Sequence, residues 1–447
     1  MTADHRTAAL PAPASRDAAP LTPNQARLWF GERLHPGHPG HVVQRALALH
    51  GPPDVPALRR TLHLLTERHD ILRTVYRGTA AGPRQRALPT VPDVLHTAGD
   101  HPGGPDEWIR QIRHRPFDLE TGPVLRWDLL RTGASEHVLL LTVHHIAFDG
   151  VSMRLLFDEL ATAYAAFHHG TPPQLPPAPS FLDFARRTAG TRQADGALAY
   201  WTAALAGAGA APALPHDFAP AGRGSGRAHA RTFRVPDPAR ARLAALARQE
   251  RCSPFMATLA LFAALLCSCA AARDVVVAIP VAERAAPEHR RLVGFLVNLA
   301  PARVACAPHD TLPDLLARTR EAVLGAAEHP LPYQQAVAAA RTSGPGTGLV
   351  RAAFDLHPAP RTPRLPGLDV TERPVHPVAT RFEVELHVQQ RGDAWDGTFL
   401  VSADLFEADA ADALADLFVA LADRWTADPG LPLTAVEDGA HPEEDDA

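Results

Sequence analysis

Residues Val138 to Ser152 read Val-Leu-Leu-Leu-Thr-Val-His-His-Ile-Ala-Phe-Asp-Gly-Val-Ser, and this stretch decides the fold. An uncharged, strand-like run ends in two adjacent histidines, His144 and His145. Asp149 lies four residues after the second histidine, and Gly150 opens an amphipathic segment with helical spacing. The stretch therefore predicts a buried strand, a short turn that carries polar side chains, and a helix.

Outward from this stretch, apolar residues alternate between helical and strand spacing. Helices are predicted over Val55 to His69, Met153 to Phe167, Asp237 to Glu250, Phe255 to Ala272 and Ala408 to Trp425, and strands over Val124 to Arg131, Val138 to Val143, Asp274 to Ile279, Gly294 to Val304 and Phe382 to Val388. The run from Thr171 to Ser180 contains five prolines and is predicted to be an extended linker. Helix and strand occur on both sides of it, which predicts two α/β lobes.

The predicted domain boundaries follow from these breaks. Residues 1–20 form a disordered leader, residues 21–175 a first lobe with the His-His motif, residues 176–436 a second lobe, and residues 437–447 an acidic tail. A length of 447 residues is about three times that of a single domain, which agrees with this division.

Composition excludes several classes of protein. No lysine occurs, so all 44 basic residues are arginine, and phosphate-loop, kinase, pyridoxal and Ser-x-x-Lys chemistry are excluded. A net charge of -5 argues against nucleic acid as the main partner. The four cysteines have neither zinc-ribbon nor disulfide-framework spacing, so we expect a reducing, cytoplasmic setting.

One segment has the apolar character of a membrane span. Residues 255–272 carry no charge, but alanine, serine, threonine and cysteine dilute the segment, and a strand-like run follows directly. We predict a buried core helix here. The N-terminus lacks the apolar core of a signal peptide, so no membrane contact is expected.

The histidine motif suggests proton-transfer chemistry. An imidazole at a strand end can project into a cleft, and its ordinary pKa near 6.5 suits it to proton transfer at neutral pH. Asp149 could orient an imidazole or bind an arginine, and Gly150 could allow close approach of a ligand. Two alternatives stay open: a buried, hydrogen-bonded histidine pair, and a metal site at His144, His145 and Asp149. Adjacent strand residues point to opposite faces, which disfavours the metal.

Several stretches together carry a family resemblance. They are Leu21 to Phe30, Glu67 to Tyr76, His144 to Gly150, Ser180 to Ala185 with Tyr200 and Trp201, Ile279 to Arg284, and Val293 to Asn298. In these stretches the chain resembles the condensation domains of nonribosomal peptide synthetases, within the chloramphenicol acetyltransferase-like superfamily. Two C-terminal stretches depart from the family pattern, at His329 to Tyr333 and at Arg351 to Pro358.

The resemblance implies a V-shaped pseudo-dimer of two chloramphenicol acetyltransferase-like lobes around a central tunnel. It places His145 at the reaction centre, with His144, Asp149 and Gly150 in the same catalytic motif. It also implies an ion pair between Asp149 and Arg284 of the second lobe. We further predict Ser152 and Asn298 as substrate-binding residues.

The same resemblance predicts acyl or aminoacyl transfer from a carrier-protein thioester to a small-molecule or carrier-bound amine or alcohol. The acyl donor is bound as a thioester to the phosphopantetheine arm of the carrier protein, and no bound cofactor or metal is expected. The chain shows no adenylation signature and no Gly-Gly-x-Ser carrier site, which predicts a free-standing enzyme.

Three functions other than condensation stay open. A coenzyme A-dependent O-acyltransferase of the same superfamily is one, although the plant-type Asp-Phe-Gly-Trp-Gly signature is absent. An epimerisation domain shares the histidine motif, but the segment Phe295 to Asn298 favours condensation. A non-catalytic platform that recruits other enzymes is the third, and the intact motif argues against it.

Overall fold

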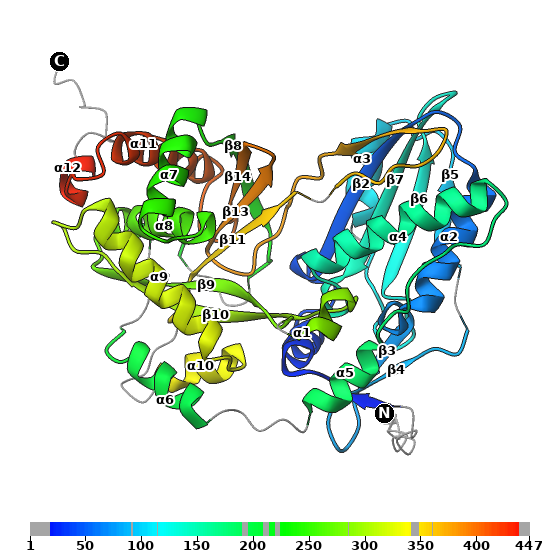
Figure 1. The fold of residues 1–447 in the computed structure, drawn as a ribbon, viewed down its shortest axis with the longest axis horizontal. Helices are drawn as coiled ribbons and strands as arrows, with labels where there is room; N and C mark the ends of the chain where they lie inside the picture. Colours follow the sequence, from blue (N-terminus) through cyan, green and yellow to red (C-terminus); the bar gives the residue numbers. More distant parts are fainter. Residues whose placement is uncertain are drawn as a thin grey trace, which may run out of the picture. The chain divides into compact units, whose positions relative to one another are not determined.

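The computed structural model describes residues 18–90, 93–113, 115–189, 195–208, 214–219, 224–284, 286–340, 348–359 and 361–437 (Figure 1). The chain divides into two compact units, and each has its own large sheet. The first unit contains the described residues of Met1–Thr191, Arg284–Leu296 and Arg361–Val375. The second contains those of Arg192–Glu283, Val297–Pro360 and His376–Ala447. Both units mix helix and strand, so the predicted α/β class is confirmed.

The first unit is built on a five-stranded sheet in the order β12-β2-β7-β6-β5. Its strands are β2 (Val42–His50), β5 (Leu95–Ala98), β6 (Leu125–Arg131), β7 (Glu136–His144) and β12 (Asp369–Arg373). The central strand β7 is antiparallel to β2 and β6, whereas β5 joins β6 in parallel. Strand β7 is buried along almost its whole length, which explains its uncharged run before the histidines.

Helices surround this sheet. They are α1 (Pro23–Leu34), α2 (Val55–Arg68), α3 (Gly104–Arg113), α4 (Gly150–His168) and α5 (Phe181–Thr188), with the short 3-10 helices η1 (Pro39–His41), η2 (Asp70–Arg73), η3 (His145–Ala147) and η4 (Pro287–Arg291). Helix α3 packs on the face of β7 that carries Val138 and Leu140. Because side chains alternate along a strand, His144 lies on this same face. Three short strands, β1 (Ala19–Pro20), β3 (Thr74–Arg77) and β4 (Arg84–Ala87), form a second sheet.

The second unit has a six-stranded sheet in the order β10-β9-β11-β13-β14-β8. Its strands are β8 (Ala228–Arg234), β9 (Asp274–Ala282), β10 (Val297–Ala305), β11 (Ala352–Pro358), β13 (Val384–Arg391) and β14 (Ala394–Ser402). Its helices are α6 (Asp195–Ala204), α7 (Asp237–Gln249), α8 (Pro254–Cys269), α9 (Leu312–Glu328), α10 (Tyr333–Ala339), α11 (Asp409–Ala427) and α12 (Leu433–Glu437).

The uncharged helix α8 is the core helix of this unit. It contacts α7, α9, α11 and β9 (Figure 1). Nearly all of its residues from Met256 to Cys267 are completely buried. The prediction of a core helix is therefore confirmed. Among the described helices, none alone has the length and apolar character of a membrane span. Helices α7 and α8 meet those two criteria as a pair, with a bend of 112° between them.

The division into units differs from the single boundary that we predicted after residue 175. The proline-rich linker has neither helix nor strand, as expected, but helix α5 beyond it belongs to the first unit. The reason is that the Asp70 carboxylate accepts hydrogen bonds from the Ser180 hydroxyl at 2.5 Å and from the backbone N–H of Phe181 at 2.9 Å. These bonds fix the start of α5 on the first unit.

The ends of the chain allow only a partial comparison. Residues 1–17, most of the predicted leader, and residues 438–447, most of the predicted acidic tail, lie outside the described residues. The last two residues of the predicted leader form β1 and pair with β4, so the ordered fold begins before residue 21.

Candidate functional site

The two histidines at the end of strand β7 differ in burial: His144 is completely buried, and His145 is partly exposed. His144 is the last residue of the strand and is held by a backbone hydrogen bond to the carbonyl of Val124 at 2.8 Å. His145 begins the 3-10 turn η3, and its side chain is partly exposed. The turn closes when the N–H of Phe148 donates to the carbonyl of His145 at 3.2 Å. The end of a buried strand therefore places His144, and the turn that follows directly places His145.

The protonated nitrogen of the His145 ring is fixed by one backbone contact. Its Nδ1 lies 2.8 Å from the carbonyl oxygen of Phe148. A carbonyl oxygen can only accept, so Nδ1–H is the donor and Nε2 carries the lone pair of the neutral ring. The edge of the Phe295 ring packs against the imidazole, with ring centroids 5.1 Å apart. The ring is thus oriented with its basic nitrogen on the side away from the turn.

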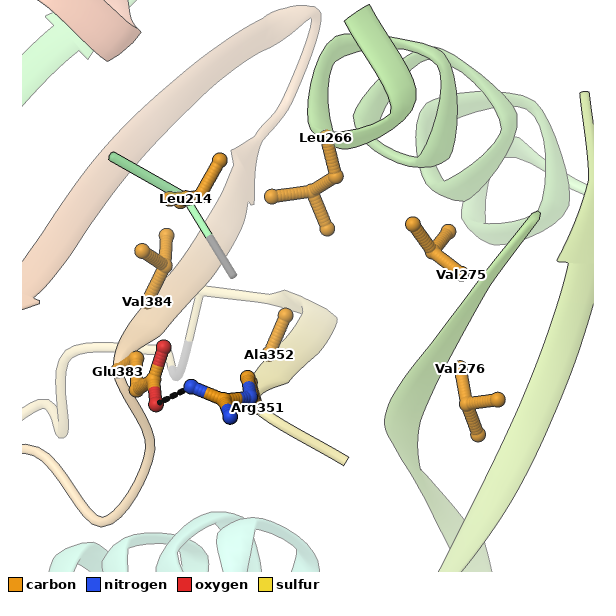
Figure 2. A pocket seen from close by; sticks show the side chains of 8 residues that line it. All are labelled: Leu214, Leu266, Val275, Val276, Arg351, Ala352, Glu383 and Val384. Carbon is orange, nitrogen blue, oxygen red and sulfur yellow. Dashed lines mark hydrogen bonds and ion pairs between the residues drawn. The ribbon is translucent and has the colours of Figure 1, made fainter. Parts of the chain in front are cut away.

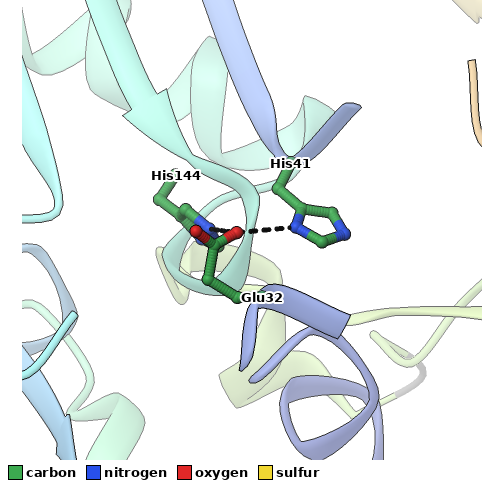
Figure 3. A group of neighbouring side chains, drawn as sticks. All are labelled: Glu32, His41 and His144. Carbon is green, nitrogen blue, oxygen red and sulfur yellow. Dashed lines mark hydrogen bonds and ion pairs between the residues drawn. The ribbon is translucent and has the colours of Figure 1, made fainter. Parts of the chain in front are cut away.

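His144 has the opposite tautomer. Its Nδ1 accepts a hydrogen bond from the backbone N–H of Ile146 at 3.1 Å, so the neutral ring carries its proton on Nε2. That nitrogen lies 3.5 Å from Oε2 of Glu32, an oxygen that also contacts Nδ1 of His41 at 2.9 Å (Figure 3). His144 is completely buried, and burial lowers the pKa of its imidazole. Two neighbouring histidines therefore present different nitrogens to their surroundings.

Glu32 remains ionised in this setting. Burial by itself raises the pKa of the carboxyl group, but hydrogen bonds from His144 and His41 lower it. The backbone N–H of Gly37 adds a third bond, to Oε1 at 2.6 Å. The balance holds the pKa of Glu32 well below its usual range.

Glu32, His41 and His144 are also the candidate metal ligands among the described residues, with ligand atoms within 4.8 Å of one another. A metal ion on Nε2 of His144 would need the lone pair of that nitrogen and would leave the proton on Nδ1. Two N–H groups, those of Nδ1 and Ile146, would then face each other at 3.1 Å. The contacts of His144 therefore fit a hydrogen bond from its Nε2–H to Glu32 better than a bond from Nε2 to a metal ion.

Asp149 caps helix α4 and forms a buried ion pair. Its Oδ1 accepts from the backbone N–H and the hydroxyl of Ser152, each at 2.8 Å. Its Oδ2 accepts from the backbone N–H of Leu296 at 3.1 Å, and Nη2 of Arg284 lies 2.8 Å from both carboxylate oxygens. The expected Asp149–Arg284 pair is therefore present. Arg284 belongs to the first unit, however, because residues 284–296 cluster with that unit.

Ser152, which we predicted to bind substrate, lies in a buried hydrogen-bond network. The residue is completely buried, and its hydroxyl contacts the carboxylate of Asp149 and both the carbonyl and the N–H of Gly294, the last two at 2.9 Å. A hydroxyl has one proton and two lone pairs, so these contacts occupy it. The sequence does not show that residue 294 returns to this position, so these contacts could not be predicted, and the role in substrate binding stays a prediction. Ser152 joins α4 to the segment that carries Arg284.

Gly150 and Asn298 have different surroundings. A Cβ atom added at Gly150 would meet no described atom within 4 Å, so packing does not demand glycine there. Asn298 lies on β10 in the second unit, where its Nδ2 donates to the carbonyl of Leu331 at 2.7 Å. Its Oδ1 is buried without a hydrogen-bond partner among the described residues.

The protein-family model of the condensation domain matches residues 15–440 of the chain. The chain belongs to the condensation-domain family. Condensation domains occur in the nonribosomal peptide synthetases of antibiotic and other natural-product biosynthesis. The resemblance to condensation domains seen in the sequence motifs is thereby confirmed.

This condensation domain is 34% identical over 434 residues to the phosphinothricin tripeptide synthetase PhsC of Streptomyces viridochromogenes, a match that covers 93% of the chain. The chain spans 40% of the length of that synthetase. The X-domain from teicoplanin biosynthesis is similar in structure, with a TM-score of 0.84 at 26% identity and coverage of 96% and 99% of the two chains. The first condensation domain of the calcium-dependent antibiotic synthetase has the same fold, with a TM-score of 0.79 at 22% identity and coverage of 94% and 99%.

The sequence analysis assigned no role to four residues of this condensation domain that surround the histidines. They are Gln25, Glu32, His41 and Phe148. Gln25 of α1 donates from Nε2 to the carbonyl of Ile146 at 3.2 Å, and Glu32 belongs to the same helix. A contact between residues more than 100 positions apart leaves no local pattern. The carbonyl of Phe148 is a backbone group, which side-chain motifs cannot reveal.

Proposed function

We propose that this condensation domain is an acyltransferase that joins an acyl or aminoacyl group, carried as a thioester on the phosphopantetheine arm of a carrier protein, to an amine or alcohol. The observation that carries the proposal is the orientation of His145. Its Nδ1–H is tied to the carbonyl of Phe148, so the basic Nε2 of a partly exposed ring is directed away from the turn.

The reaction requires one proton acceptor and good positioning. The nucleophile N–H or O–H gives its proton to Nε2 of His145 while nitrogen or oxygen attacks the thioester carbonyl. The C–S bond then breaks, and the leaving thiolate of the arm takes the proton back from the imidazolium. An α-amine has a pKa near 8, so an imidazole is a strong enough base. A thioester is already activated, and proximity supplies much of the remaining rate acceleration.

Asn298 is the residue of the second unit that we propose to contact substrate. Its Oδ1 is a buried acceptor without a partner among the described residues, and a buried acceptor without a partner is unfavourable. The N–H of an amide, such as those in a pantetheine arm, or of the nucleophile satisfies it. The V-shaped arrangement and the tunnel stay predictions from the family resemblance.

We also place the protein in the cytoplasm, as a partner of carrier proteins rather than of nucleic acid. The four cysteines are in the reduced form, which suits a reducing compartment. The net charge of -5 gives no general attraction for a nucleic-acid backbone.

The test is intact-mass analysis of a carrier protein loaded with a panel of acyl and aminoacyl groups and mixed with a panel of amines and alcohols. The wild-type chain should release product from at least one pair, and His145→Ala should release almost none. His96→Ala is the matched control, because the exposed His96 also precedes an aspartate by four residues yet lies outside the site. Equal turnover by His145→Ala would contradict the proposal.

A second candidate is a platform that binds another protein without catalysis. It is favoured by the similarity to an X-domain solved in complex with OxyB, which has a TM-score of 0.83 and 26% identity to this chain. A wild-type chain that yields no product from any pair, yet binds a partner enzyme of its own pathway, would support this candidate. Transfer from a free coenzyme A thioester, but not from a loaded carrier, would instead indicate a coenzyme A-dependent O-acyltransferase.

A further inference from the structure

The turn that presents His145 is held through both backbone polar groups of Ile146, one bonded to helix α1 and the other to His144. The carbonyl of Ile146 accepts from Gln25 at 3.2 Å, and the N–H of Ile146 donates to Nδ1 of His144 at 3.1 Å. Ile146 is the residue directly after His145 and is completely buried. These two bonds hold the peptide that follows His145 within the η3 turn.

The bond from the Ile146 N–H exists only in one tautomer of His144. Nδ1 must have its lone pair, so the proton of the neutral ring sits on Nε2. On that side of the ring lies Oε2 of Glu32, at 3.5 Å (Figure 3). In the other tautomer, Nδ1–H would face the Ile146 N–H, and the Nε2 lone pair would face a carboxylate. Both contacts would be repulsive.

Glu32 is itself held in place by its surroundings. Its Oε1 accepts from the N–H of Gly37 at 2.6 Å, and its Oε2 contacts Nδ1 of His41 at 2.9 Å. The His41 ring can lie against α1 because residue 31 is glycine: a Cβ atom there would come within 3.2 Å of the ring. The carboxylate therefore meets His144 in a defined position.

We propose that Glu32 is a positioning residue: it sets the tautomer of His144 and thereby holds the η3 turn that directs Nε2 of His145. The inference rests on the proposed function for its effect on rate. Its structural part stands apart from that function, because the tautomers can be measured without substrate.

The first experiment is a long-range 15N–1H spectrum of the full chain with ring-15N histidine, with the two signals assigned by His144→Gln and His145→Gln. His144 should show a protonated Nε2 and an unprotonated Nδ1, and His145 the reverse. In Glu32→Leu the His144 pattern should change, whereas Glu32→Gln should keep it, because the amide oxygen can still accept from Nε2–H. A His144 that carries its proton on Nδ1 in the wild type would overturn the proposal.

The second experiment separates positioning from stability by kinetics. Glu32→Leu should lower kcat by about 10-fold to 100-fold, the usual scale for a misplaced catalytic group, with KM little changed. Glu32→Gln should recover most of the rate. Glu120→Gln is the control, because this exposed acid pairs with Arg33 of the same helix and should have no effect. If Glu32→Leu fails to fold, Glu32→Ala, which also removes the acceptor for Nε2–H of His144, takes its place in both experiments.

Three results would contradict the proposal. One is a fall in kcat for Glu32→Leu with an unchanged His144 tautomer. Another is a changed tautomer with a wild-type rate. The last is binding of Co2+ with a tetrahedral visible spectrum that Glu32→Gln abolishes, because a metal site would need the Nε2 lone pair. If the wild type makes no product at all, the proposed function fails, but the spectra still test the role of Glu32.

Discussion

Replacement of Asp149 by alanine should destabilise the first unit strongly. The carboxylate is almost completely buried and accepts from Ser152, Leu296 and Arg284. The side chain of Arg284 is 8% exposed, so the variant would leave a buried guanidinium without its counter-charge. Removal of one partner of a buried pair costs about 3–5 kcal/mol, and loss of the helix N-cap alone costs about 1 kcal/mol.

The assay is urea unfolding followed by circular dichroism and tryptophan fluorescence, with the midpoint and slope fitted together. Asp149→Ala should lose at least about 3 kcal/mol of unfolding free energy, a large part of the roughly 5–15 kcal/mol of a typical domain. Asp149→Asn should lose less, because Oδ1 still accepts from the N–H of Ser152. A loss for Asp149→Ala below about 1 kcal/mol, the range of exposed pairs, would refute the reasoning.

A double variant distinguishes a structural from a catalytic carboxylate. Asp149→Leu with Arg284→Met removes both charges, and replacement of a whole buried pair by apolar side chains is often neutral. The double variant should be more stable than Asp149→Ala and should regain transfer activity in proportion to its folded fraction. A stable double variant without activity would show that Asp149 contributes to the chemistry directly.

Three further predictions concern other contacts. Gly294→Ala should destabilise the fold by about 1–3 kcal/mol in urea unfolding, because the new Cβ would lie 2.1 Å from the Phe181 ring and the φ of 159° disfavours a side chain. Gly82→Ala is the control: its Cβ would meet no described atom within 4 Å, so it should show only the smaller effect of its positive φ. Asp70→Ala should increase amide hydrogen exchange at the start of α5 and not in α4, because Ser180 and Phe181 lose their acceptor. For Glu385, burial raises the pKa, but His387, Arg381 and Thr380 lower it more, to about 2. A lowered folded-state pKa gives stability that is present above pH 4.5 and is lost as the pH falls towards 2. In urea unfolding, the wild type should therefore be more stable than Glu385→Gln at pH 7 and should lose this advantage between pH 4.5 and pH 2. An advantage that does not change with pH would contradict this prediction.

Much of the fold could be predicted because its signals are local. The uncharged run of β7, the amphipathic spacing of α4 and the uncharged length of α8 each reflect burial of one element in its own surroundings. Segment 294–304 was only partly correct, since β10 begins at Val297. The residues just before it form a loop that returns to Asp149 and Ser152 instead of extending the strand.

The site could be predicted where a motif is contiguous and not where distant segments meet. His145 and Asp149 came from one short stretch, and the Arg284 pair from family resemblance. The bonds of Ser152 to Gly294 could not be predicted, because the two residues are 142 positions apart. Glu32 was not found for the same reason, since it lies 112 residues before His144. Backbone acceptors such as the carbonyl of Phe148 leave no trace in residue identities.

In the proposed reaction Nε2 of His145 accepts the proton of the nucleophile, and single-turnover kinetics measures this step. The rate constant for product formation from a preloaded carrier, at saturating nucleophile, should fall about 10²-fold to 10⁴-fold in His145→Ala, the usual range for loss of a general base. The unfolding midpoint should stay near that of the wild type. A His145→Ala variant that forms product at the wild-type rate would contradict the account.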